Sequence, residues 1–98
     1  MRIRILDPAI EDLAAGYKFY ESQAASVGDY FLDCLYSDID SLVLYAGIHR
    51  KKFGFHWMLS KRFPYAIYYV VDDDLAIIHA VLDCRQDPAK IAERMSRE

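Results

Sequence analysis

The chain has 98 residues, a length typical of a single folding domain, and a formal net charge of −3 at pH 7. That charge argues against a large sequence-independent nucleic-acid interface, because such binding depends on neutralising phosphates. Hydrophobic residues make up 54% of the sequence, which is rich for a small monomer and predicts apolar surface that a partner or a second copy covers.

The residue pattern also excludes several classes of protein. Cys34 and Cys84 are too few for a disulfide scaffold and lack zinc-binding spacing, so we expect free, buried thiols. The three histidines do not have metal-ligand spacing, and no glycine-rich phosphate loop is present, so we expect neither metal nor cofactor. No leader opens the chain and no apolar run approaches the ~20 residues of a membrane span. We therefore expect a cytoplasmic protein that has no membrane partner.

The N-terminal half predicts one strand followed by two helices. Arg2–Leu6 alternates basic and apolar residues, which is typical of a short strand. Asp7, followed by proline, predicts the N-cap of a first helix, and apolar residues at helical spacing continue toward Gly28, which is expected to end it. Asp29 is expected to cap a second helix that closes at Gly47. The short connection between them predicts an antiparallel helix pair.

The C-terminal half predicts three strands and a short helix. His56–Ser60 has strand character, and Tyr65–Val71 with Leu75–Leu82 predicts a hairpin around three aspartates. Asp87, again followed by proline, predicts the start of a last helix. The element order β-α-α-β-β-β-α predicts an α+β fold in one domain, residues 1–98, with an antiparallel β-sheet packed on one face by an α-helical hairpin.

Strand alternation places three polar side chains, His79, Asp83 and Arg85, on one face of the last predicted strand. A histidine and a carboxylate can form an acid–base pair, and an arginine can stabilise a phosphate. Residues four apart on a strand are separated by about 13 Å, however, so His79 and Asp83 would not touch. A surface histidine without a catalytic role is the favoured interpretation. The opposite face is small and apolar and is expected to meet the core: Ala76, Ile78, Ala80, Leu82 and Cys84.

Other residue groups each allow two interpretations. Tyr65, Tyr68 and Tyr69 could stack nucleic-acid bases, but such residues are more often cross-strand packing partners. The basic runs at 50–52 and 61–62 form either a local basic rim or an ordinary solvated face. The residues by themselves therefore define no active site.

Three stretches resemble the RelE/ParE superfamily of type II toxin–antitoxin toxins, also called plasmid-stabilisation proteins. They are ILDPAIEDLAAGYKFYES, the GDYF that opens the second helix, and KRFPYAIYYVVDDDLAIIHAVLDCRQDP. The last stretch is the most specific and resembles the ParE-like branch. The resemblance implies a growth-inhibiting toxin that is blocked by a cognate antitoxin, usually encoded beside it. Within the superfamily, RelE-like members cleave messenger RNA in the ribosome and ParE-like members act on DNA gyrase.

The chain departs from the RelE-type nucleases at positions that the resemblance links to RNA cleavage. Tyr65 stands where these nucleases have an arginine, and Ile91 where they have a tyrosine, so only Arg85 matches a catalytic position. A nuclease needs groups that activate a ribose hydroxyl and stabilise a pentavalent phosphate. Many relatives also carry an arginine where His56 and Trp57 stand, and this departure favours a homologue without toxicity. The departures at positions 65 and 91 argue against RNA cleavage. The resemblance therefore implies a toxin that acts by binding its target.

We expect the functional surface to comprise Lys61, Arg62 and Arg85, with His79 and Asp83 as further members. The first hypothesis is a toxin that binds DNA gyrase or another protein. Two alternatives stay open: a ribosome-dependent endoribonuclease centred on Arg85, and a degenerate homologue that binds antitoxin without toxicity. A homodimer of the free chain also stays open.

Overall fold

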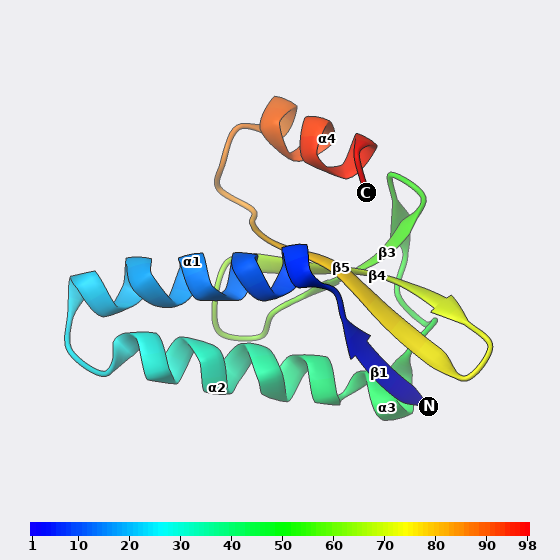
Figure 1. Cartoon of the computed structure of the whole chain (residues 1–98), viewed down its shortest axis with the longest axis horizontal. Coiled ribbons are helices and arrows are strands. Elements are labelled where there is room, and N and C mark those ends of the chain that lie inside the picture. Colours follow the sequence, from blue (N-terminus) through cyan, green and yellow to red (C-terminus); the bar gives the residue numbers. More distant parts are fainter.

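The computed structural model describes residues 1–98 and consists of one sheet with helices on both faces (Figure 1). The strands are β1 Arg2–Ile5, β2 Lys51–Lys52, β3 Phe55–Leu59, β4 Tyr65–Asp72 and β5 Leu75–Asp83. The helices are α1 Asp7–Gln23, α2 Val27–Asp40, the single turn α3 Leu42–Tyr45 and α4 Pro88–Ser96. The predicted α+β fold and the order of its main elements are confirmed, with α3 and the short β2 as additions.

The sheet has the strand order β1-β5-β4-β3-β2. Strands β2 to β5 pair antiparallel with their neighbours, whereas β1 lies parallel to β5, so the sheet is mixed. Short turns force antiparallel pairing between strands adjacent in sequence. β1 pairs with the last strand of the chain, so no turn fixes its direction.

Each face of the sheet carries its own core. The hairpin of α1 and α2 covers one face and α4 covers the other (Figure 1). The larger core includes the fully buried Leu13, Phe31, Leu35, Ile67 and Tyr69. The core beneath α4 consists of Ala66, Tyr68, Ala80, Leu82, Ile91 and Met95.

Two helix starts differ from the prediction, and a third is confirmed. Asp7 is the first residue of α1, and Leu6 takes the N-cap position without a side-chain hydrogen bond. Gly28 lies in the first turn of α2 and does not end α1, so Asp29 is not the cap of α2. Asp87 caps α4 as predicted, because its carboxylate accepts the backbone N–H two residues on at 3.0 Å.

Gly28 serves the packing of the two helices. A Cβ at this position would lie 2.8 Å from the carbonyl oxygen of Tyr17 on α1, closer than real Cβ contacts. The backbone N–H groups of Ser26 and Gly28 donate to the Glu21 carboxylate at 3.1 and 3.0 Å. Glu21 therefore satisfies the amides at the start of α2, the role that the sequence assigned to Asp29.

A bulge in the central hairpin changes which way β5 faces. Tyr68 pairs with Ala80 whereas Tyr69 pairs with Ile78, which leaves His79 as the extra residue on β5. Before the bulge, even-numbered residues of β5 pack beneath the α1–α2 hairpin, and after it they pack beneath α4. The predicted single core face for positions 76 to 84 was therefore wrong, because strict alternation ends at His79.

The cysteines are free, but neither is fully buried as expected. Cys34 on α2 is partly buried, whereas Cys84 directly after β5 is exposed. The chain leaves the sheet at that point, and Cys84 lines a surface pocket at the margin of the core beneath α4, with Tyr68 and Ile91. None of the helices combines the length and the apolar character that crossing a membrane requires.

Candidate functional site

Three of the five predicted functional residues, Lys61, Arg62 and Arg85, lie on two loops at one end of the sheet. β3 and β5 end there and β4 begins there, so residues 60–64 and 84–86 are neighbouring loops, which we call the basic end. The backbone N–H of Cys84 donates to the Pro64 carbonyl at 2.8 Å and ties the loops together. The N–H of Ser60 donates to the Tyr65 carbonyl at 2.8 Å and closes the first loop at its base.

A buried carboxylate on α2 holds the first loop of the basic end. One Asp38 oxygen accepts the Ser60 hydroxyl at 2.7 Å and the Lys61 backbone N–H at 3.2 Å. Asp38 is only 6% exposed and is the one charged residue in the buried set. Its contacts fix the backbone from which the exposed Lys61 and Arg62 side chains extend.

An aromatic cluster anchors the other end of the same loop. The ring of Phe63 lies 4.8 Å from Tyr20 and 5.1 Å from Phe31, centroid to centroid, and the Tyr65 ring lies 4.9 Å from Phe31. These edge-to-face contacts lie within the favourable range for aromatic pairs. The loop is therefore fixed at both ends while its basic side chains remain in solvent.

Arg85 is held in place by Asp83 and by a tyrosine on α1. Its Nε and Nη2 donate to the two Asp83 carboxylate oxygens at 3.0 and 2.9 Å, and its Nη2 also donates to the Tyr20 hydroxyl at 3.2 Å. The hydrogen bond from Arg85 is the main reason that the pKa of Asp83 is lowered, and the same bond raises the pKa of Arg85. The charge of Arg85 is balanced within the site although its side chain is 56% exposed.

The two other positions that the resemblance links to RNA cleavage are part of the packed interior. Tyr65 is 7% exposed and belongs to the aromatic cluster, and Ile91 of α4 is 8% exposed and packs in the core between this helix and the sheet. Burial, followed by the nearby Asp83 carboxylate, raises the pKa of Tyr65 to about 12. Both side chains contribute to packing, and Tyr65 also lines a cavity next to Asp83.

The raised pKa of Tyr65 predicts a loss of stability in alkaline solution. The ordinary pKa of a tyrosine hydroxyl is 10.0. Because the pKa is higher in the folded chain, the contribution of the neutral hydroxyl to stability is fully present below pH 10 and is lost as the pH rises toward 12. Between pH 10 and pH 12 we expect the free energy of unfolding of the wild type to fall by about 2 kcal/mol more than that of Tyr65→Phe. Urea unfolding of both proteins across this range measures the difference. Equal pH slopes would contradict the burial of the hydroxyl.

His79 is not part of the basic end. It lies on the face beneath α4, where its ring lies 5.0 Å from Phe55 and its Nδ1 lies 3.7 Å from Glu98. Asp83 faces the α1–α2 hairpin, so the prediction that both share a face with Arg85 was wrong for His79. The reason is the extra residue in β5, which inverts the alternation between the two positions.

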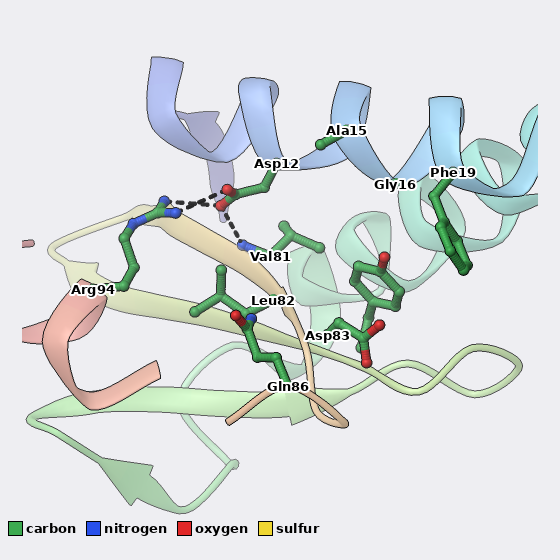
Figure 2. Close-up of a pocket in the computed structure, with 10 residues that line it drawn as sticks. Asp12, Ala15, Gly16, Phe19, Val81, Leu82, Asp83, Gln86 and Arg94 are labelled. Carbon is green, nitrogen blue, oxygen red and sulfur yellow. Dashed lines mark hydrogen bonds and ion pairs between the residues drawn. The ribbon is translucent and has the colours of Figure 1, made fainter. Parts of the chain in front are cut away.

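A cavity of about 360 Å³ lies beside the basic end, between α1, β5 and α4 (Figure 2). Asp12 crosses this space with three hydrogen bonds. Its carboxylate accepts hydrogen bonds from both terminal nitrogens of Arg94 at 2.8 Å and from the backbone N–H of Val81 at 3.0 Å. Asp83 lines the same cavity nearer to the loop. The Asp12–Arg94 pair closes this space on the α4 side and attaches α4 to α1.

Two residues of this site were missed by the sequence reasoning, Asp38 and Tyr20. Asp38 follows Leu35 by three positions and precedes Leu42 by four, so it lies on the apolar stripe of α2. A carboxylate on a buried stripe indicates a partnered charge, and this signal was available. Tyr20 carried no comparable signal, because its contact with Arg85 joins residues 65 positions apart.

Comparison with known proteins identifies relatives by sequence and by structure. A sequence model of the family described as "ParE toxin of type II toxin-antitoxin system, parDE" matches residues 3–88. A solved structure described as "Chromosomal ParDE TA system from P. aeruginosa" superposes with a TM-score of 0.74 at 16% identity, covering 83% of this chain and 92% of that chain. At that identity the structural likeness shows the fold alone. Comparison with curated protein sequences gives no match.

Proposed function

The chain belongs to the ParE toxin family of type II toxin–antitoxin systems, and from this premise we propose that it arrests growth by binding DNA gyrase until a cognate antitoxin neutralises it. The basic end supplies the proposed target-binding surface. Lys61 and Arg62 are exposed on a loop that is anchored on both sides, and Arg85 lies on the neighbouring loop. A pre-ordered cationic loop suits protein recognition, because little conformational entropy is lost when it binds.

The state of Arg85 is the observation that carries the choice of binding over RNA cleavage. Its Nε and Nη2 are engaged by both oxygens of Asp83 and by the Tyr20 hydroxyl, so a phosphate could take two guanidinium nitrogens only by displacing Asp83 or Tyr20, and Nη1 alone remains open. The burial of Tyr65 and Ile91 supports the same choice, since these positions supply packing instead of proton transfer.

Induction of the chain in a bacterial host tests this function against its alternatives. We expect growth arrest with altered plasmid supercoiling and intact messages, and we expect Arg85→Ala to produce no change in message integrity. Message cuts that map to translated codons and vanish in Arg85→Ala would identify a ribosome-dependent nuclease instead. Soluble protein without any growth arrest would identify a degenerate homologue that binds antitoxin but is not toxic.

A second measurement tests the neutralisation. Co-expression of the antitoxin encoded beside the toxin gene is expected to restore growth, and the two proteins are expected to co-purify. Continued arrest with both proteins present at comparable levels would contradict the proposed pairing.

A further inference from the structure

Two aromatic side chains of the α1–α2 hairpin are half exposed where the hairpin meets the basic end. Phe19 lies near the end of α1 and Tyr30 in the first turn of α2, and each is 49% exposed. A single exposed ring is ordinary on a protein surface. These two differ from an ordinary exposed ring because both rest on the aromatic cluster that anchors the basic loop.

A series of ring contacts connects Phe19 to Tyr30. The Phe19 ring meets Tyr20 edge-on at 5.0 Å. Tyr20 meets Phe63 at 4.8 Å, and Phe63 lies 5.7 Å from Tyr30, centroid to centroid. The two middle rings are themselves partly buried against the larger core, so each exposed ring is held on one side and meets solvent on the other. A ring fixed in this way loses little conformational entropy on binding, as an aromatic anchor of an interface requires.

Tyr30 lies beside the first loop of the basic end. The ring that it contacts, Phe63, directly follows Arg62 in that loop. Lys61 and Arg62 are exposed and line a cavity of about 280 Å³ together with Asp33 of α2. Neither cation forms an ion pair with this or any other carboxylate. On this side, two free cations therefore lie beside an anchored aromatic ring.

Phe19 lies beside the second loop of the basic end. Tyr20, which it touches, accepts a hydrogen bond from Nη2 of Arg85 at 3.2 Å. Phe19 also lines the cavity of about 360 Å³ together with Asp83, the carboxylate that pairs with Arg85 (Figure 2). Because the charge of Arg85 is already balanced, this side offers a partner an aromatic ring instead of a free charge.

This combination favours a protein partner over a nucleic acid. A nucleic-acid site needs several free cations along the path of the backbone, and this surface has two, Lys61 and Arg62. Asp29 and Asp33 are exposed on α2, one residue before and three residues after Tyr30, where they repel phosphates. A protein surface can instead offer carboxylates to the two cations and an apolar side chain to each ring.

We propose that Phe19 and Tyr30 are the apolar anchors of the target-binding surface, and that the region of the target that they bind is acidic, with hydrophobic side chains beside its carboxylates. Lys61 and Arg62 attract and orient this region, and the two rings hold it after docking. The inference rests on the proposed function and deepens it by naming the residues that set the strength of target binding. The cations therefore control the association rate and the rings the dissociation rate.

Two ring variants and two matched controls test these anchors. Phe19→Ala and Tyr30→Ala remove rings that are already half exposed, so both variants are expected to fold. Tyr36→Ala and Phe53→Ala are the controls, because they remove rings that are 39% and 43% exposed outside the series of ring contacts. Tyr36 lies on α2 and lines a different cavity, and Phe53 lies in the turn between β2 and β3. Circular dichroism melting establishes that all four variants are folded.

Surface plasmon resonance against purified gyrase is the readout. We expect each ring variant to raise the Kd about tenfold or more through faster dissociation, with an unchanged salt dependence of the association rate. The double variant Lys61→Ala/Arg62→Ala is expected to associate more slowly and with a weaker salt dependence. Both control variants are expected to bind like the wild type.

Hydroxyl-radical footprinting of the wild-type complex tests the anchors without any substitution. We expect Phe19 and Tyr30 to be protected by bound gyrase, and Tyr36 and Phe53 to stay reactive. Wild-type affinity in both ring variants, or full reactivity of both rings in the complex, would overturn the anchors while leaving the proposed function intact. A wild-type chain that does not bind gyrase would overturn the proposed function, and the anchors with it.

Fluorescence anisotropy with a labelled single-stranded oligonucleotide tests the nucleic-acid alternative. We expect no binding of the wild-type chain at physiological salt. Binding that Phe19→Ala and Tyr30→Ala both abolish would assign the rings to base stacking and overturn the protein partner.

Discussion

Phe31→Ala is expected to lower the free energy of unfolding by about 3–5 kcal/mol. The ring is fully buried, stacks on Tyr20 at 5.1 Å and meets Phe63 and Tyr65 edge-on. It also fills the space above Gly16, where a Cβ would lie 2.5 Å from the ring. Truncation leaves a cavity between both helices and the basic loop, and chemical denaturation measures the loss.

Phe19→Ala is the matched control for this substitution. Phe19 touches the same cluster through Tyr20, at 5.0 Å, but is 49% exposed, so its removal leaves no enclosed cavity. We expect a loss of about 1 kcal/mol or less. Similar losses for the two variants would show that the cluster does not form the centre of the larger core.

Asp12→Ala is expected to cost about 2 kcal/mol and to loosen α4. Arg94 would lose two hydrogen bonds of 2.8 Å, and the Val81 N–H would lose its acceptor. Trp57 is the single tryptophan and lies beside Ile91 of α4, so its fluorescence reports on undocking of the helix. We expect a red-shifted emission at temperatures below the main unfolding transition.

Glu11→Ala provides the control for Asp12→Ala, because it removes an exposed carboxylate from the same turn of α1. Its effect is expected to stay within about 0.5 kcal/mol. The double variant Asp12→Ala/Arg94→Ala should cost less than the sum of the single variants, because Arg94→Ala leaves Asp12 without its cation and Asp12→Ala leaves Arg94 with Glu98 as its only carboxylate. Additive losses would mean that the pair contributes nothing specific to holding α4.

The sequence predicts the fold well where local patterns determine it. The hairpin of β4 and β5, the two long helices and the cap at Asp87 all follow from periodicity or turn chemistry within a few residues. The parallel pairing of β1 with β5 could not follow from such patterns, because it joins the two ends of the chain. Gly28 was misread because its reason is a contact with Tyr17, which local sequence does not reveal.

The candidate site was predictable only in part, and a bulge explains the main error. Lys61 and Arg62 are exposed on one loop and Arg85 lies on the next, as expected from their positions at strand ends. His79 was placed on the same face as Asp83 by strict alternation, but the extra residue in β5 turns Asp83 toward the α1–α2 hairpin and leaves His79 beneath α4. Bulges depend on pairing with the neighbouring strand, so a single strand's pattern does not indicate them.

The central claim is that this ParE-family chain acts by binding gyrase, and a supercoiling assay with purified proteins tests it most directly. We predict that the chain inhibits supercoiling by gyrase in vitro, and that the double variant Lys61→Ala/Arg62→Ala inhibits at least tenfold more weakly. Equal folding of the variant, checked by thermal melting, is the control. Gyrase that remains fully active at excess toxin, while programmed ribosomes lose their message, would contradict the claim.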